Sequence, residues 1–160
     1  MSSTGRLASL TLPQHNFAVS DQPLSGEGAR RVGGRWNYRG VPLIYLAESI
    51  ALATLEVLVH LQDTETLSKY AVAEIRFDSA LVQELRVQDL PENWNVFPHP
   101  VGTKAIGQEW LDAQSSALLK VPSSVSPREA NYLLNPEHPN FGEVEVVAVL
   151  EHAFDPRLLL

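Results

Sequence analysis

The stretch that decides the fold is GGRWNYRGVPLIYLAESIALATLEVLVHL, residues 33–61. It joins two glycines and an arginine-rich loop to a short apolar run, and then to an apolar segment that carries one carboxylate, Glu56. The run at 41–47 predicts a buried strand, and Ser49 is placed to cap a helix that continues to about residue 61. Because an unpaired charge is costly to bury, Glu56 is expected to face a pocket or an opposite charge.

Helical spacing indicates what surrounds this carboxylate. Residues three and four apart share a face, which places Glu56 beside Leu52 and His60, while most other positions of the helix are apolar. Such a helix is expected to be buried on most sides. Arg35, from the preceding loop, is the candidate partner of Glu56. Two interpretations stay open: a satisfied ion pair in the core, or a carboxylate poised in a cleft.

Length and composition indicate one globular domain. The chain has 160 residues, of which 44% are hydrophobic and 19% are charged, so a single domain over 1–160 is expected. No apolar run approaches the roughly 20 residues of a membrane span. The opening residues lack the basic start and apolar stretch of a signal peptide, so a cytoplasmic protein without membrane contact is expected.

The charged and sulfur-containing residues exclude several functions. The chain has no cysteine, which excludes disulfides, thiolate catalysis and cysteine-ligated metals. A formal net charge of −7 disfavours a nucleic-acid surface. Basic residues nevertheless concentrate at Arg30, Arg31, Arg35 and Arg39, which suits a small anionic ligand. The alternative for Arg30, Arg31 and Arg39 is that they solvate a loop.

The remaining elements favour an α+β fold over a doubly wound parallel one, because strands and helices do not alternate regularly. Thr103 is expected to cap a second helix, and Trp94 to lie in a loop. The expected segments are a short strand or extended lead-in followed by a loop at 1–29, strands at 70–77 and 118–122, a loop at 91–100, a helix to 117, a short helix mixed with turns at 126–141, and a strand at 144–150 that could be central to the sheet.

Several side chains are candidates for a site. Gly33 and Gly34 fit no phosphate-binding fingerprint, but they would let the backbone of a flexible loop approach a ligand that Arg35 clamps. Tyr45 is either a hydrogen-bonded core aromatic or a ring that contacts a flat heterocycle. Ser123 follows a strand and a proline without a nucleophile-elbow motif or an obvious triad.

Two further polar residues, Asn131 and His138, belong to the same rim or form turns. The five histidines lack a metal-ligand spacing, so no metal site is expected.

Taken together, the blocks of sequence resemble the RES-domain family over residues 24–158, with 1–23 as a lead-in segment. The resemblance is carried by GEGARRVGGRWNYRGVPLIYLAESIALATLEVLVHL, TKAIGQEWL, LLKVPSSVSPREANYLLNPEHPNF and FDPRL. It implies a toxin of a bacterial toxin–antitoxin pair with a fold similar to diphtheria-toxin-like ADP-ribosyltransferases. It also implies that NAD is the substrate, without a prosthetic group.

The resemblance carries over residue by residue. The arginine, tyrosine, glutamate and serine of the family are Arg35, Tyr45, Glu56 and Ser123, each catalytic and in contact with NAD, and Asn131 matches a further binding position. The counterpart of another family arginine is only loosely matched, which leaves the role of Arg6 open. An Xre-type antitoxin is expected to cover the site and to supply all DNA binding. A homodimer within that complex is also open.

The implied chemistry is cleavage of the nicotinamide–ribose bond through an oxocarbenium-like state. Glu56 would stabilise the positive charge, Arg35 would bind the pyrophosphate, Tyr45 would pack on the ribose, and Ser123 would orient Glu56 or the substrate. The acceptor, whether water, phosphate or a cellular protein, stays open. Two further alternatives are a catalytically silent module that binds an antitoxin, and a structural domain without a ligand.

Overall fold

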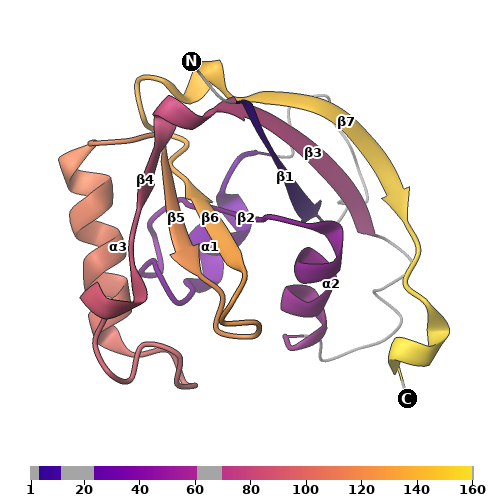
Figure 1. Ribbon diagram of the computed structural model, residues 1–160, viewed down its shortest axis with the longest axis horizontal. Coiled ribbons are helices and arrows are strands. Elements are labelled where there is room, and N and C mark those ends of the chain that lie inside the picture. The colour runs from indigo at the N-terminus through magenta and orange to yellow at the C-terminus, as the bar shows by residue number, and fades with distance from the viewer. Residues whose placement is uncertain (1–3, 12–23, 61–69, 160) are drawn as a thin grey trace.

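The computed structural model describes residues 4–11, 24–60 and 70–159, with the side chains of 6–11 and 159 excepted (Figure 1). The strands are β1 Thr4–Thr11, β2 Ile44–Ala47, β3 Tyr70–Asp78, β4 Val82–Glu84, β5 Leu118–Pro122, β6 Ala130–Leu134 and β7 Glu145–His152. The helices are α1 Glu27–Val32, α2 Ile50–Leu58 and α3 Val101–Ala113, with short 3₁₀ turns at Ser79–Leu81, Val87–Asp89, Phe141–Glu143 and Pro156–Leu159. The side chain of Arg6 lies outside the described part.

The strands form a seven-stranded sheet with the order β4-β5-β6-β2-β1-β3-β7. Neighbouring strands are antiparallel, except that β4 and β5 are parallel. β1 pairs with β3 along its whole length, but it pairs with β2 only at Ala8 and Ala47. The sheet therefore opens between β2 and β1, and α2 packs against both strands there (Figure 1).

The helix α2 begins as predicted but is less buried than predicted. The Ser49 hydroxyl accepts a hydrogen bond from the Leu52 amide at 3.1 Å, which confirms the cap. The helix ends at Leu58, three residues before the predicted end. Leu52 and Ala53 are buried, whereas the apolar residues of its other faces are exposed by 41 to 56%: Ile50, Leu55 and Val59. The prediction of burial on most sides is wrong, because this helix covers the sheet with one narrow face only.

The prediction for 1–29 is only partly correct. β1 confirms the short strand, but the expected loop includes the start of α1, whose side-chain pairs are local. The Glu27 carboxylate accepts hydrogen bonds from Arg30 at 2.6 Å and Arg31 at 2.9 Å, an arrangement that stabilises a single helical turn. Gly33 ends this helix with a φ of 73° and donates its amide to the Ala29 carbonyl.

The short helix expected within 126–141 is a strand, β6. Its residues pair with β2 on one side and with β5 on the other, so the hydrogen bonds of the sheet override a local pattern that also suits a helix. Leu133 and Leu134 are fully buried on opposite faces of this central strand. The turn predicted after it is confirmed, because the Asn135 side chain caps the Glu137 amide.

The last strand lies at the edge of the sheet rather than at its centre. β7 pairs with β3 only, and Figure 1 shows it as the outermost arc of the sheet. Several of its apolar side chains are exposed, among them Val149 and Leu150. The apolar run at 144–150 therefore forms an edge strand whose side chains are partly exposed, and the prediction of a central position is wrong.

The helix α3 packs on a cluster that contains all three tryptophans: Trp36, Trp94 and Trp110. Its Gly107 lies so close to Trp36 that an added Cβ would stand 1.8 Å from the Trp36 carbonyl oxygen. The helix begins after Pro100, so the prediction that Thr103 caps it is wrong; the Thr103 hydroxyl instead donates to the Pro100 carbonyl at 2.9 Å. It ends four residues earlier than expected, where Gln114 is left-handed.

Within the described ranges, none of the helices is both long and apolar enough to span a membrane.

Candidate active site

Glu56 is held by two side chains that come from distant parts of the sequence. The Ser123 hydroxyl donates to Glu56 Oε1 at 2.7 Å, and Asn131 Nδ2 donates to the same oxygen at 2.6 Å. Ser123 follows the end of β5, and Asn131 pairs with Val121 and Ala47 in the sheet. Among the described residues, Oε2 receives no hydrogen bond. The carboxylate is thus fixed through one oxygen and keeps the other available.

Ser123 is fully buried and its hydroxyl is saturated. Its oxygen accepts hydrogen bonds from the amides of Val125 at 3.1 Å and Ser126 at 3.0 Å, while its proton goes to Glu56. The tight turn after Pro122 produces this geometry, because a serine hydroxyl readily bonds the backbone two and three residues on. A hydroxyl in this arrangement orients the carboxylate, and the two amides that its oxygen accepts occupy the lone pairs that a nucleophile would need.

Arg35 is buried, but it does not form the predicted ion pair with Glu56. Its Nη1 donates to the carbonyls of Trp94 at 2.5 Å and Val96 at 3.0 Å. Burial lowers the pKa of Arg35, and the nearby Glu56 carboxylate and Tyr45 hydroxyl oppose that shift. The guanidinium therefore stays cationic and lies near Glu56 without neutralising it. Local sequence could not indicate this arrangement, because the carbonyls that Arg35 bonds belong to a loop some 60 residues further along the chain.

Tyr45 anchors the loop that carries Arg35. Its hydroxyl accepts a hydrogen bond from the Trp36 amide at 3.1 Å and donates to Asn37 Oδ1 at 2.8 Å. Burial raises the pKa of this phenol, so it is a neutral donor. Gly34 is required beside it, because a Cβ there would stand 2.5 Å from the Tyr45 hydroxyl. The glycine makes room for a protein contact, whereas the sequence suggested room for a ligand.

Asn37 is a structural centre of the site that the sequence interpretation missed. It is fully buried, and its Nδ2 lies within hydrogen-bonding distance of the carbonyls of Ala29, Tyr38 and Val41. Its Oδ1 accepts from Tyr45, so one side chain ties α1 to β2. The residue stands two positions after Arg35 in the motif GGRWN, and its presence in that motif is the only signal that sequence offers.

The three arginines near Arg35 in the sequence lie outside the site: Arg30, Arg31 and Arg39. Arg30 and Arg31 are exposed and pair with Glu27, whose pKa they lower to about 2. Arg39 is exposed as well. The interpretation that these three solvate a surface segment is therefore the better one, and Arg35 alone is buried. His138 forms a turn, since its Nδ1 accepts from the Asn140 amide.

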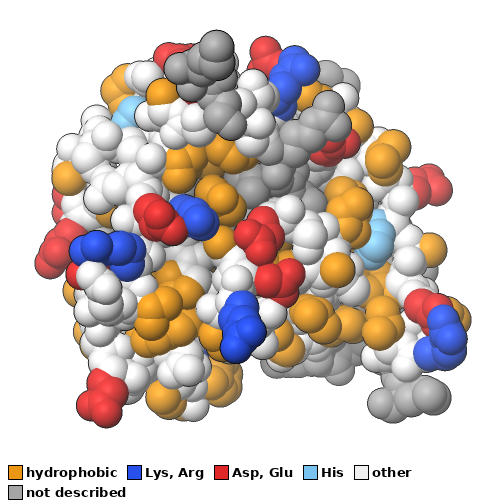
Figure 2. Space-filling view, in the orientation of Figure 1, with side chains coloured by type: hydrophobic (Ala, Val, Ile, Leu, Met, Phe, Trp, Pro, Cys, Tyr) orange, Lys and Arg blue, Asp and Glu red, His pale blue; other side chains and the backbone are white. Residues whose placement is uncertain are grey.

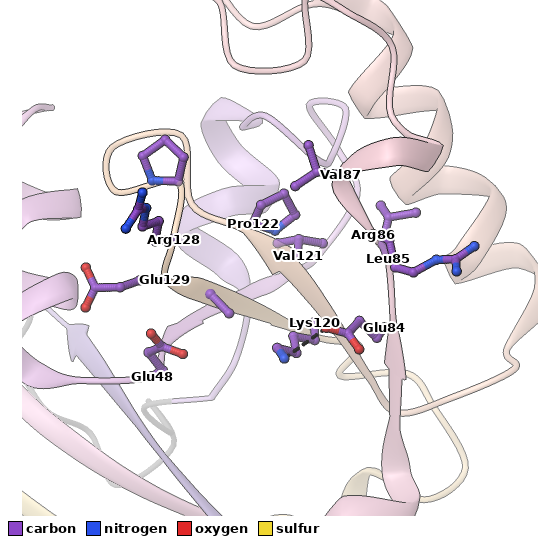
Figure 3. Close-up of a pocket in the computed structure, with 12 residues that line it drawn as sticks. Glu48, Glu84, Leu85, Arg86, Val87, Lys120, Val121, Pro122, Arg128 and Glu129 are labelled. Carbon is purple, nitrogen blue, oxygen red and sulfur yellow. Dashed lines mark ion pairs between the residues drawn. The ribbon is translucent and has the colours of Figure 1, made fainter.

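A depression on another face of the sheet contains none of the predicted site residues. It has a volume of about 280 Å³ and is lined by charged side chains that include Glu48, Arg128 and Glu129 (Figure 3). Lys120 forms an ion pair with Glu84 in it at 2.9 Å. Because Lys120 alternates with Val121, which pairs with Asn131, the depression and the Glu56 site lie on opposite faces of β5. Figure 2 shows acidic and basic side chains mixed around this hollow.

No group of three or more histidine, aspartate or glutamate side chains in the described ranges could hold a metal ion. The arrangement brings together a fixed carboxylate, a buried guanidinium and the amide of Asn131, whose Oδ1 has no partner among the described residues. A carboxylate of this kind can stabilise a developing positive charge, while a guanidinium nearby attracts an anionic group of the same ligand.

Comparison with known proteins identifies the family. Residues 7–156 match the RES domain. Toxin Res of Yersinia enterocolitica is 47% identical over 135 residues, which cover 84% of this chain and 89% of that protein. The Prs ADP-ribosylating toxin of Sphingobium sp. is 39% identical over 140 residues, or 85% of this chain and 86% of the toxin.

A third relative has a solved structure. The NAD(+) phosphorylase MbcT of Mycobacterium tuberculosis is 40% identical over 88 residues, or 54% of this chain and 44% of MbcT. The crystal structure of the M. tuberculosis MbcT–MbcA toxin–antitoxin complex matches 96% of this chain and 86% of the compared chain, with a TM-score of 0.75 and 23% identity. This likeness shows a single mixed α/β domain with the MbcT fold. The motifs, the fold and the match over most of its length together show that the chain belongs to the RES domain family.

Proposed function

We propose that this protein is the toxin of a toxin–antitoxin pair and that it cleaves the nicotinamide–ribose bond of NAD in the cytoplasm. Two of its relatives are named for activities that fit this reaction, an NAD(+) phosphorylase and an ADP-ribosylating toxin. The observation that carries the proposal is the Glu56 carboxylate, whose Oε1 accepts hydrogen bonds from Ser123 and Asn131.

The site suits the charge changes of the reaction. Cleavage passes through an oxocarbenium-like state, which a fixed carboxylate stabilises. Glu56 Oε2 would face the ribose, and Arg35 would bind the pyrophosphate through nitrogens other than Nη1. Nicotinamide leaves as a neutral molecule from a cationic ring, so the reaction needs no general acid. Tyr45 would contact the ribose with its ring while its hydroxyl fixes the loop.

Phosphate or water is the acceptor in the leading form of the proposal, because the MbcT relative is named an NAD(+) phosphorylase. Transfer of ADP-ribose to a cellular protein is the second candidate, and the name of the Sphingobium relative supports it. In both forms the bond that breaks is the same, and the products distinguish them. We further propose that the fold is related to diphtheria-toxin-like ADP-ribosyltransferases.

An Xre-type antitoxin is proposed to cover the site. The MbcT structure contains an antitoxin, which supports a partner of this class. The apolar side chains of Val59, Val96 and Phe97 are exposed by 50 to 73%, on α2 and on the loop that Arg35 holds, and would form the contact. DNA binding then belongs to the antitoxin, and a homodimer of the toxin within the complex remains part of the proposal.

The test is nicotinamide release from NAD by purified protein, with and without phosphate. Glu56→Gln keeps an oxygen for Ser123 and Asn131 but removes the charge, so release is expected to fall by about two orders of magnitude or more. Glu92→Gln, at an exposed glutamate, is the matched control and should not change the rate. Full activity in Glu56→Gln would overturn the proposed site.

The products then identify the acceptor. ADP-ribose indicates water, and a phosphorylated ADP-ribose indicates phosphate. If folded wild-type protein releases no nicotinamide with either acceptor, cleavage for a small acceptor is wrong. Labelling of a lysate protein by ADP-ribose would then support the transferase, and the absence of labelling would support the silent antitoxin-binding module.

A further inference from the structure

Two buried side-chain atoms in the described ranges have no hydrogen-bond partner, and one of them belongs to the site already described. They are Asn131 Oδ1 and His99 Nδ1. Asn131 bonds Glu56 through its amide nitrogen, whereas His99 belongs to none of the motifs used above. Since about nine in ten buried polar atoms are paired, an orphaned atom requires an explanation, and a missing ligand group is one.

The loop that carries His99 is held by Arg35. Trp94 is buried in the tryptophan cluster, and the carbonyls of Trp94 and Val96 both accept from Arg35 Nη1. His99 follows three residues later, and the Arg35 charge is close enough to lower its pKa. The guanidinium and the imidazole therefore lie near each other.

The same imidazole also contacts the turn that follows α2, the helix that carries Glu56. The rings of His60 and His99 pack edge to face with their centroids 6.0 Å apart. His60 stands four residues after Glu56, about one helical turn further along. The Phe97 ring packs on His99 from its own loop, with centroids 5.3 Å apart. His99 thus connects the Arg35 loop to the turn after α2 through ring contacts with His60, and it also packs on Phe97.

The ionisation of His99 suits a cationic substrate. Burial lowers its pKa to about 4, and the charges of Arg35, His60 and Lys104 act in the same direction. At neutral pH the ring is uncharged, with one nitrogen as donor and the other as acceptor. An imidazolium would repel the cationic nicotinamide ring of NAD, and a neutral imidazole does not.

We propose that His99 is a substrate-binding residue that forms a hydrogen bond through Nδ1 with the nicotinamide riboside half of NAD. That half offers ribose hydroxyls and a carboxamide, all of which can satisfy the orphaned nitrogen. The proposal rests on the proposed function for the identity of the ligand. It assigns His99 a place beside Arg35, Glu56 and Asn131 that the sequence interpretation did not give it.

The first experiment measures kcat and KM for nicotinamide release. His99→Ala is expected to raise the KM for NAD about tenfold, the size of one lost hydrogen bond, with a smaller change in kcat. His99→Gln, which restores a polar group, should recover part of that loss. The matched control is His138→Ala, at the opposite end of β6 from Asn131, and it should leave the KM unchanged. An unchanged KM in His99→Ala would overturn the proposal.

The second experiment does not depend on turnover. NAD is titrated into Glu56→Gln and into the double variant Glu56→Gln, His99→Ala by calorimetry, and the double variant is expected to bind about tenfold more weakly. If wild-type protein releases no nicotinamide but binding still depends on His99, the reaction is wrong and the binding role stands. Equal binding by the two variants, or no binding by either, overturns the role of His99.

Discussion

At the scale of single residues, the Ser123 hydroxyl connects stability with chemistry. It accepts two backbone amides and donates to Glu56, and it is fully buried. Its removal leaves two half-buried amide groups without this acceptor and frees the carboxylate to move. One side chain therefore determines both the turn after β5 and the orientation of the proposed catalytic group.

Ser123→Ala is expected to lower the free energy of unfolding by about 1 kcal/mol, because two half-buried amides lose their acceptor. It should also lower the kcat of nicotinamide release. Urea unfolding and steady-state kinetics measure the two effects. Ser115→Ala removes an exposed hydroxyl that bonds Gln83, and it serves as the control with little change expected in either quantity. A Ser123→Ala protein with wild-type stability would contradict the hydrogen-bond pattern.

His99 gives the protein a pH dependence at the same scale. Its folded pKa of about 4 lies below the ordinary value of 6.5, so the unfolded chain binds more protons between these values. The contribution of this residue to stability is therefore present above pH 6.5 and is lost as the pH falls toward 4. Unfolding free energies measured across that window should fall less steeply in His99→Gln than in wild-type protein. Equal slopes would show that the imidazole is not held neutral.

At the scale of secondary structure, the contact between α3 and Trp36 depends on one missing methyl group. A Cβ at Gly107 would meet the Trp36 carbonyl at 1.8 Å, and backbone cannot move aside as a side-chain end can. Trp36 precedes Asn37 and follows Arg35, so any displacement of this backbone would be transmitted to the site.

Gly107→Ala is expected to destabilise the fold by about 1 to 3 kcal/mol through overpacking, although alanine favours helices by about 1 kcal/mol. Gly28→Ala in α1 is the matched control, because its Cβ would enter open space and only the gain in helix propensity remains. Thermal unfolding of the two variants should shift the melting temperature in opposite directions. A stabilised Gly107→Ala protein would show that the helix does not approach Trp36 this closely.

Local pattern predicted those elements whose cause is local. The cap at Ser49 and the strand at 70–77 depend on residues a few positions apart, and both predictions are confirmed. The predictions for β6 and β7 were wrong because the place of a strand in the sheet depends on which distant strands pair with it. The same limit applies to the site. Arg35 and Glu56 were predicted from the sequence, but local pattern did not indicate their partners. Arg35 bonds the carbonyls of Trp94 and Val96, and Glu56 bonds side chains that are distant in sequence.

At the scale of the whole molecule, the proposed activity should appear as a change in the cell. Expression of the wild-type chain without an antitoxin is expected to lower cellular NAD severalfold and to stop growth, because each turnover consumes one NAD. Glu56→Gln should spare both NAD and growth at equal protein level. Cellular NAD measured after induction checks this expectation. Growth arrest by Glu56→Gln, with NAD unchanged, would point to toxicity that does not involve this site.

The carboxylate and its two holders are 67 and 75 residues apart in sequence. A chain still on the ribosome has made Glu56 long before it has made Ser123 or Asn131. The proposed cleavage centre therefore cannot be assembled until translation has passed both Ser123 and Asn131. Partial products that stop before residue 123 should therefore lack the proposed activity and be harmless to the cell that makes them.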